Sequence, residues 1–334
     1  MAKIKLIYNP HAGSKKHIFA RTNFLLLQDI YALLYKYEID FDTSPILKEG
    51  DARRLAREAA SDGYEYVIVA GGDGTVGEAA TGLVGSNTAL AILPLGTYMN
   101  VAKMLSIPLN LESAVMVIKM GNIRSIDVGE VISLKEEQVD GKAAREANYF
   151  LESVGIGIEA DFQNFLLTYK KNRWHSIVEL VKGMKSFYNA PLSIELDNDR
   201  IIESKAQLIM ISNGPFMGAN LSVAPTSKLN DHVLKVTIYK MTNKKLLWHI
   251  FKLKMTKQGS YLRSHNLNPA IQTYTSTFVN IKSKKTRPVD ADARIYGETP
   301  ISVKVRPGAL KVIVGFAGSK KDSALLEKNV YIKA

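Results

Sequence analysis

The residues best suited to chemistry form a glycine-rich block, Gly71-Gly72-Asp73-Gly74-Thr75, directly after the apolar run at 67–70. Glycines permit positive φ and let a ligand approach the main chain with no Cβ in the way. Successive main-chain N–H groups in such a turn can bind the oxygens of a phosphate. A carboxylate would repel a bare phosphate, so Asp73 predicts a contact with a ligand hydroxyl or a magnesium-bound phosphate. A tight turn with no ligand is the alternative.

The residues after this block predict a helix. Thr75 and Glu78 have the spacing of a capping box, which predicts that a helix begins at Thr75. The positive end of that helix would point at the glycine block and favour an anion there. Glu78 therefore has two interpretations, a ligand contact or the capping partner of Thr75.

The order of strand, turn and helix recurs in the first 120 residues. The turn Asn9-Pro10-His11-Ala12-Gly13 follows a predicted strand at 3–8, Thr43 ends one at 39–43, and Gly96 and Thr97 follow one at 89–93. Helices are predicted at 18–35, 51–61 and 111–120. This alternation predicts an α/β domain with a doubly wound, mostly parallel sheet. Ligands bind such sheets where the strands end, so we expect the turns to meet in one crevice.

Beyond Ile126-Asp127-Val128-Gly129 the pattern changes to strands. They are predicted at 127–134, 146–154, 192–197, 201–212, 233–240, 277–282 and 301–315, with helical stretches at 160–188 and 242–257. Recurring alternation and turn signals predict a second, β-rich domain, a sandwich with inserted helices. We place the first domain at 1–128 and the second at 129–316.

Composition limits the classes of protein. The 334 residues carry a formal net charge of +12 and no cysteine, which excludes disulfides and thiolate metal sites. No apolar run approaches the roughly 20 residues that cross a bilayer, and the first residues enter a strand pattern rather than a signal peptide. The expected location is the cytoplasm. No recognition motif for nucleic acid accompanies the charge, so no nucleic-acid partner is expected.

Residues 240–265 carry much of the positive charge and no acid. Apolar residues interleave with the lysines at roughly helical spacing. A basic amphipathic helix can lie on a membrane surface. The alternative is a helix packed on the core with a solvated basic face. The sequence does not determine the oligomeric state, and a homodimer is one alternative.

Taken in order, these blocks resemble the diacylglycerol kinase catalytic family, soluble lipid kinases that include bacterial diacylglycerol kinases and sphingosine and ceramide kinases. The glycine block and the turn at Asn9 match the pattern of that family, as do residues 94–103 (PLGTYMNVAK), 150–160 (FLESVGIGIEA), 211–218 and 224–234. The resemblance implies a nucleotide-binding first domain and a lipid-binding second domain. It also implies that residues 317–334 return to the first domain.

The resemblance implies roles for particular residues. ATP would be bound through Asn9, Pro10, His11, Ala12, Gly13, Thr43, Gly71, Gly72, Asp73, Gly74, Thr75, Glu78, Gly96 and Thr97. Mg²⁺ would be bound by the side chain of Asp231 with the main-chain carbonyls of Lys228 and Val233.

The carboxylate that takes the proton of the lipid hydroxyl would be Asp292, with Asp73 as the second catalytic acid. Asp290 and Glu298 are alternatives to Asp292, because Arg294 stands where the family has glutamate. Met99 similarly replaces an asparagine of the family, so one polar contact there is lost or shifted.

The function implied by the resemblance is transfer of the γ-phosphoryl group of ATP to a lipid hydroxyl. The acceptor would be diacylglycerol or a related lipid, a sphingoid base included, at the inner face of the membrane. One alternative is an NAD kinase, which shares the Gly-Gly-Asp-Gly-Thr block. Another is a catalytically weak nucleotide- or lipid-binding regulator, motivated by Arg294 and Met99.

Overall fold

The computed structural model describes residues 3–10, 23–133, 148–157, 191–197, 199–217, 221–242, 245–246, 248–249, 268–292 and 294–316. The chain divides into two compact units. Unit 1 is Met1–Ile126 with Gly308–Ala334, and unit 2 is Asp127–Pro307. Our boundaries after residues 128 and 316 remain predictions, and the segment 317–334 lies outside the described residues.

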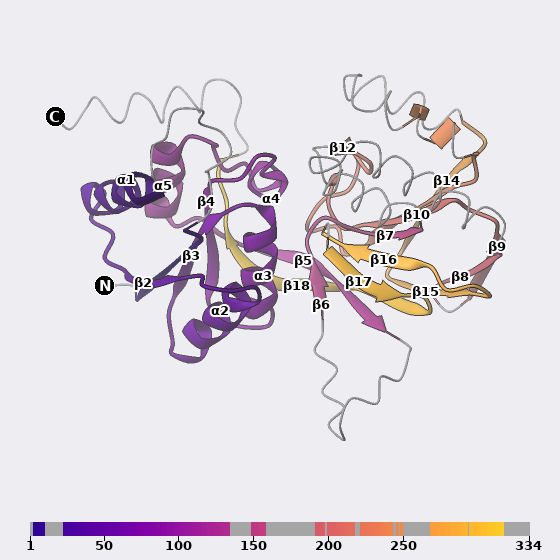
Figure 1. The fold of residues 1–334 in the computed structure, drawn as a ribbon, viewed down its shortest axis with the longest axis horizontal. Helices are drawn as coiled ribbons and strands as arrows, with labels where there is room; N and C mark the ends of the chain where they lie inside the picture. The colour runs from indigo at the N-terminus through magenta and orange to yellow at the C-terminus, as the bar shows by residue number, and fades with distance from the viewer. Residues whose placement is uncertain are drawn as a thin grey trace. The chain divides into compact units, whose positions relative to one another are not determined.

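Unit 1 is built on a sheet of short strands (Figure 1). β1 (Ile4–Tyr8), β2 (Asp42–Pro45), β3 (Tyr66–Gly71) and β4 (Ala89–Pro94) lie in the order β2-β1-β3-β4. Each neighbouring pair is parallel. β3 and β4 are buried along almost their whole length, as strands covered on both faces should be.

Helices cover both faces of this sheet. They are α1 (Asn23–Lys36), α2 (Asp51–Ser61), α3 (Asp73–Leu83), α4 (Asn100–Met104) and α5 (Leu111–Met120). α2 packs against α3, and α1 packs against α5. Figure 1 shows the two pairs on opposite faces. The predicted doubly wound α/β domain is therefore confirmed.

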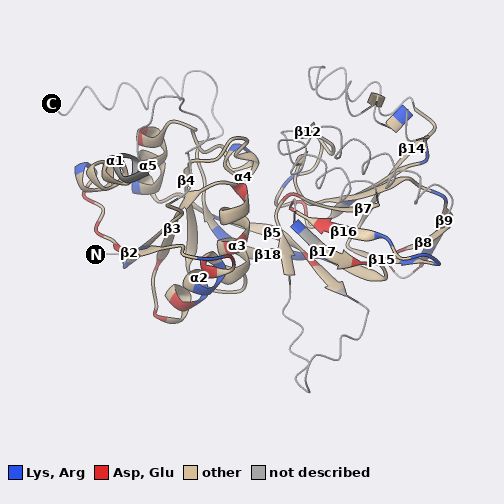
Figure 2. Cartoon of the chain, viewed as in Figure 1, with Lys and Arg blue, Asp and Glu red and all other residues tan. Residues whose placement is uncertain are grey.

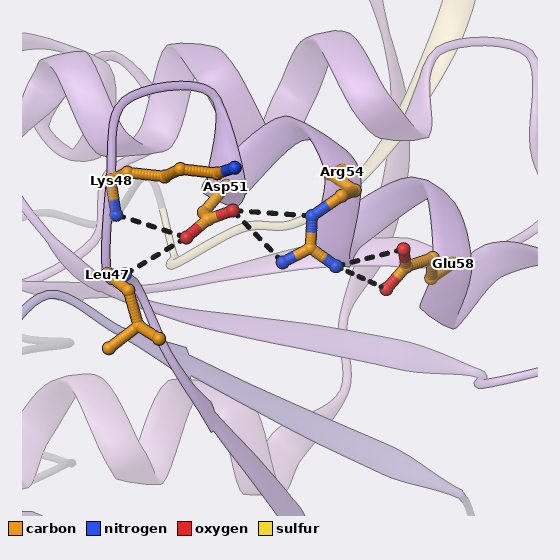
Figure 3. Close-up of polar contacts among 5 residues, drawn as sticks. All are labelled: Leu47, Lys48, Asp51, Arg54 and Glu58. Carbon is orange, nitrogen blue, oxygen red and sulfur yellow. Dashed lines mark hydrogen bonds and ion pairs between the residues drawn. The ribbon is translucent and has the colours of Figure 1, made fainter.

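α2 begins at a carboxylate that ties the helix to the loop before it (Figure 3). Asp51 is 3% exposed, and its Oδ2 accepts the main-chain N–H groups of Leu47 and Lys48, each at 3.1 Å. Its Oδ1 accepts from Nη2 of Arg54 at 3.0 Å, and the same guanidinium donates to Glu58 at 2.9 Å. The hydrogen bond from Arg54 is the main cause that holds the pKa of Asp51 below its usual range. These bonds start the helix at the predicted residue.

α3 begins two residues before the predicted start at Thr75. Its N-cap is Gly72, with φ −93° and ψ 178°, and no side chain caps it. The carbonyl of Gly72 accepts the N–H of Val76 at 3.0 Å, so the main chain closes the first turn by itself. The capping-box prediction is therefore wrong, because Thr75 and Glu78 already lie within the helix.

The described part of unit 2 contains two mainly antiparallel sheets around a common core. One follows the order β18 (Ile301–Ile313), β15 (Phe278–Ser283), β8 (Leu192–Leu196), β9 (Arg200–Ser204), and β5 (Ile123–Ser133) pairs with both β18 and β6 (Asn148–Phe150). The other follows the order β14 (Ile271–Ser276), β13 (Leu234–Tyr239), β10 (Leu208–Ser212), β7 (Ser153–Gly157), β16 (Pro288–Ala291), β17 (Arg294–Glu298).

Buried aliphatic side chains of both sheets, such as Ile194 and Ile281 from one and Ile156 and Ile211 from the other, form a single cluster. The predicted sandwich is confirmed. β11 (Phe216–Met217) and β12 (Leu221–Ser222) form a separate hairpin. The sequence predicted no strand over β14, β16 or β17. The predicted helices at 160–188 and, for the most part, 242–257 lie outside the described residues.

β18 is shared by the two units. Its first residues pair with β15, with Ile301 opposite Ile281. Near its end, Val312 lies opposite Leu90 of β4 and the pairing is parallel. The last described strand of the chain therefore extends the sheet that the first strands begin.

No helix among the described residues is both long enough and apolar enough to cross a bilayer. Figure 2 shows basic and acidic residues distributed over the described elements of both units.

Candidate active site

The carboxyl ends of β1 and β3 are where the connections of the unit 1 sheet diverge. From β1 the chain passes through α1 to β2 on one side, and from β3 it passes through α3 to β4 on the other. Ligands of open α/β sheets bind at such a switch point, outside the strand ends. Asn9 follows β1, Gly71 ends β3 and Gly72 follows it, so two of the predicted phosphate turns lie here.

Asn9 joins the first turn to the glycine block. Its main-chain N–H donates to the carbonyl of Ala70 at 3.0 Å, and its Nδ2 lies 3.5 Å from Oγ1 of Thr75. The Thr75 side chain also packs against Gly71, where an added Cβ would lie 2.9 Å from Oγ1. The structure thus brings Asn9, Gly71 and Thr75 together. Pro10 continues the turn, and the predicted residues His11, Ala12 and Gly13 lie outside the described part of the chain.

The turn after β4 packs against the turn after β3, glycine to glycine. The N–H of Leu95 donates to the carbonyl of Gly71 at 3.0 Å. A Cβ on Gly96 would lie 2.7 Å from Cα of Gly72, closer than real Cβ atoms come. A Cβ on Gly72 would meet Cα of Gly96 at an ordinary 3.5 Å. Only glycine at position 96 allows this approach.

The carboxylate of Asp73 faces the start of α4. Its Oδ1 accepts the N–H of Val101 at 3.2 Å. Burial raises the pKa of Asp73, while hydrogen bonds from the amides of Val101, Met99 and Asn100 oppose that rise. The side chain therefore satisfies the first amides of a neighbouring helix, as an N-cap residue would. Its predicted contact with a ligand stays a prediction.

Met99 departs from the lipid-kinase pattern at a strained position. It is the N-cap of α4 and has φ 50°, a left-handed conformation that suits asparagine better than methionine. Its side chain is 1% exposed, and Sδ accepts the N–H of Gly96 at 3.1 Å. The altered polar contact that the sequence predicts therefore lies at the amide of Gly96.

The other predicted nucleotide-binding residues surround these turns. Thr43 is exposed on β2, opposite Leu6, and its Oγ1 accepts a hydrogen bond from Tyr31 at 3.1 Å. Gly74 and Thr97 are exposed, and Glu78 is partly buried in α3. Because β1 lies between β2 and β3, Thr43 stands one strand away from the glycine block.

In unit 2, Asp292 is bound by three main-chain amides of the turn between β6 and β7. Oδ2 accepts the N–H of Leu151 at 2.7 Å, and Oδ1 accepts those of Glu152 at 2.9 Å and Ser153 at 3.1 Å. Asp292 has φ 46°, and its own N–H donates to the carbonyl of Ser153 at 3.0 Å. The carboxylate is therefore fixed in orientation and partly exposed. Its role as a catalytic base stays a prediction.

Asp290 has a different environment. It lies on β16 opposite Gly155 of β7 and is 1% exposed. Burial, and then the negative charge of Asp292, raise the pKa of Asp290 to about 8. Among the described residues its Oδ1 has no hydrogen-bond partner. Asp290 is thus mostly a neutral acid at pH 7.

The predicted magnesium ligands lie in the loop before β13. Oδ2 of Asp231 accepts the N–H of Lys228 at 3.3 Å, and Oδ1 accepts that of Val233 at 3.4 Å. No group of three His, Cys, Asp or Glu side chains suited to a metal occurs in the described residues. A carboxylate with main-chain oxygens is the kind of donor set that a hard cation takes. The carboxylate of Asp231 and the two carbonyls therefore fit Mg²⁺ as a donor set, in which the carboxylate carries the single negative charge.

Beside this loop, His232 and Asp127 form a pair that the sequence does not reveal. Nδ1 of His232 lies 2.9 Å from Oδ1 of Asp127, and the main-chain N–H of His232 donates to Oδ2 at 2.7 Å. His232 has φ 60°, where the family pattern has glycine. The two hydrogen bonds to the buried carboxylate of Asp127 stabilise His232 in this left-handed conformation. The Ile-Asp-Val-Gly motif marks Asp127, but nothing in it indicates a partner 105 residues away.

Asn213 connects these parts of unit 2. It is fully buried, and its Nδ2 donates to the carbonyls of Asp127 and Leu151, each at 3.1 Å. It therefore ties β5 to the turn that holds Asp292. The Asn-Gly pair at 213–214 is the sequence signal that could have identified it.

Comparisons with known proteins agree with this arrangement. Residues 3–131 match the diacylglycerol kinase catalytic domain, and residues 152–314 match the YegS C-terminal NAD kinase beta sandwich-like domain. The diacylglycerol kinase of Staphylococcus saprophyticus is 25% identical over 301 residues, 89% of this chain and 90% of that protein. The diacylglycerol kinase of Bacillus subtilis is 28% identical over 273 residues, 80% of this chain and 82% of that protein.

A crystal structure of a diacylglycerol kinase from Bacillus anthracis has the same fold, with a TM-score of 0.67 at 23% identity over 94% of this chain and 97% of that chain. The two domain matches follow one another along the chain, and the curated relatives are similar along most of their length. These names favour a lipid kinase over the NAD kinase alternative. The predicted resemblance to the diacylglycerol kinase catalytic domain family is confirmed, and so is the predicted class of enzyme, a lipid kinase.

Proposed function

We propose that the protein transfers the γ-phosphoryl group of ATP to a hydroxyl group of diacylglycerol, with a sphingoid base as the alternative acceptor. The observation that supports this most is the pair of contacts that the glycine block makes at the switch point of a parallel sheet. Thr75 of this block lies near Asn9, and Gly72 packs against Gly96. The names of the curated relatives favour diacylglycerol as the acceptor.

In this proposal the phosphates of ATP bind at the start of α3. Gly72 leaves the main chain accessible there, since among the described residues an added Cβ would meet only Cα of Gly96 within 4 Å. The N-terminus of α3 carries a partial positive charge that favours an anion. Asp73 is oriented toward α4, where amides offset its negative charge. Phosphoryl transfer depends mainly on such positioning and charge neutralisation.

The second unit would supply the metal ligands. Asp231, with the carbonyls of Lys228 and Val233, would hold Mg²⁺, which neutralises phosphate charge when bound. The loop already gathers these residues, because the amides of Lys228 and Val233 donate to the carboxylate.

Asp292 would contact the hydroxyl of the acceptor lipid. As the oxygen bonds to the γ-phosphorus, the bond from that phosphorus to ADP breaks and the hydroxyl proton passes to the carboxylate. Three amides orient this carboxylate, which has about four acceptor positions in all. Asp290 behind it is mostly protonated at pH 7, which avoids a second negative charge beside the phosphate.

The place of action in this proposal is the cytoplasmic face of the membrane, where the acceptor lipid lies. The net charge of +12 favours an anionic surface. Co-sedimentation with vesicles tests this part.

The test of the whole proposal is transfer from labelled ATP to diacylglycerol, sphingosine and NAD in separate assays of the purified chain. We expect label in diacylglycerol. Label in NAD alone would refute the proposal, and ATP binding with no transfer to any acceptor would favour the regulator. Asp292→Asn should lower turnover at least 100-fold, a typical loss for a general base. The matched control is Asp40→Asn at an exposed position, which should change nothing.

A further inference from the structure

A short helical stretch after β13 exposes a tryptophan. Lys245, Leu246, Trp248 and His249 are helical, and Trp248 is 59% exposed. Leu246 is 0% exposed and His249 is 8% exposed. Residues three apart lie on the same face of a helix, so Leu246 and His249 form the inner face while Lys245 and Trp248 form the outer face.

The inner face is anchored to unit 2. Leu246 belongs to an apolar cluster with Leu208 and Tyr239, and its N–H donates to the carbonyl of Thr242 at 2.8 Å. The ring of Tyr239 lies 6.1 Å from that of His249. Because the inner face is held in this way, Trp248 points outward as a consequence of the fold.

Exposed lysines stand near Trp248 in the sequence. Lys240 and Lys245 are exposed, and the sequence from 240 to 265 contains no acid. Tryptophan is favoured at the boundary between lipid headgroups and acyl chains, because its ring is apolar and its N–H is polar. Lysines beside it attract anionic headgroups. An acidic protein would match the lysines but gives no comparable reason for an exposed indole.

We propose that the Trp248 face, defined as Lys245 and Trp248, docks on an anionic phospholipid bilayer. Trp248 inserts at the level of the headgroups, and Lys245 contacts their phosphates. This deepens the proposed function, since a lipid kinase must reach an acceptor that stays in the bilayer. Binding to vesicles is measured without ATP, so its failure is distinct from a failure of catalysis.

The first experiment is co-sedimentation of the full chain with vesicles of equimolar phosphatidylglycerol and phosphatidylcholine. We expect Trp248→Ala to weaken binding about tenfold, because the buried apolar area is lost. Lys245→Gln should weaken it about fivefold, as one basic residue near the surface does. The matched controls are Ile201→Ala, which removes a 67% exposed side chain of β9, and Lys284→Gln at another exposed lysine. Equal binding by Trp248→Ala and wild type would overturn the proposal.

The second experiment uses the fluorescence of Trp248. The chain has two tryptophans, so a Trp174→Phe background leaves Trp248 as the sole emitter. Emission should shift to the blue with the anionic vesicles and be quenched by brominated acyl chains. No shift and no quenching, with vesicle binding retained, would assign membrane contact to another surface and overturn the proposal.

The third experiment separates docking from catalysis and from assembly. With diacylglycerol dispersed in neutral detergent micelles, Trp248→Ala should keep wild-type turnover, whereas with anionic vesicles its apparent KM should rise. Loss of turnover in both assays would contradict a docking role. A change of molar mass in light scattering on Trp248→Ala would instead identify the face as an interface between copies of the chain and overturn the proposal.

Discussion

Asp290 and Asp292 are two residues apart, yet Asp292 accepts three main-chain N–H groups while Oδ1 of Asp290 has no partner among the described residues. Two carboxyl groups in such different environments have different chemistry. The partly exposed one is held by main-chain amides, and the buried one is mostly protonated at pH 7. The next two predictions test this difference.

Asp292→Ala should destabilise the fold as well as stop turnover. It removes the acceptor for the amides of Leu151, Glu152 and Ser153, and it places alanine at φ 46°. We expect the free energy of unfolding to fall by about 3 kcal/mol in urea denaturation. Asp292→Asn keeps one acceptor oxygen and should lose about half as much. Wild-type stability of Asp292→Ala would show that the three hydrogen bonds contribute nothing.

Asp290 should make stability depend on pH. Its pKa is raised from 3.8 to about 8, so the folded state holds the proton more tightly than the unfolded state. The stabilising contribution is complete below about pH 4 and is lost as pH rises through about 8. Asp290→Asn should therefore flatten the fall in unfolding free energy between about pH 4 and pH 8. Asp292→Asn should move that fall to lower pH, because the charge that raises the pKa of Asp290 is gone. Parallel pH curves for all three proteins would contradict this.

Gly96→Ala and Gly72→Ala should separate packing from ligand binding. The Cβ of Gly96→Ala would lie 2.7 Å from Cα of Gly72 and 2.6 Å from Sδ of Met99, so the turns must move apart. We expect a loss of about 1–3 kcal/mol in stability. Gly72→Ala meets only an ordinary contact at 3.5 Å. It should keep its stability but weaken ATP binding in calorimetry by about tenfold, because a methyl group then stands where the phosphates approach. Unchanged ATP affinity would contradict a phosphate site at Gly72.

Asp73 can be tested for its two roles separately. Asp73→Ala removes an acceptor at the start of α4 and should cost about 1–2 kcal/mol of stability and all turnover. Asp73→Asn keeps a side-chain oxygen and should restore most of the stability. If Asp73→Asn also restores turnover, the carboxylate has only a structural role; continued loss of turnover supports the ligand contact.

Much of unit 1 could be predicted because its local signals agree with its tertiary packing. The helices at 51–61 and 111–120 have the predicted bounds, and β3 and β4 are apolar along their length. β2 was predicted three residues early, because Ile39 looks like part of a strand. In the structure the N–H of Ile39 donates to the carbonyl of Leu34 near the end of α1, so its main chain closes the helix. Its apolar side chain is buried there, at 4% exposed.

The sequence did not predict several strands of unit 2, because their local signals disagree with their tertiary packing. β16 contains Pro288 and a buried aspartate, which argue against a strand on local grounds. Tertiary packing overrides these preferences.

The residues of the candidate site also differ in how far the local sequence predicts them. The motifs at Asn9 and Thr75 predict from local sequence that both bind a ligand. The bonds of Asp292 to a turn about 140 residues earlier leave no local signal.

The pairing of Val312 with Leu90 has a consequence for synthesis of the chain. When a ribosome has completed β4, the strand that will cover its edge is still more than 200 residues from being made, since β18 begins at Ile301. The nascent first unit therefore emerges with an unfinished β edge, which is covered only after β18 has been made. Truncation before β18 should yield a product that aggregates.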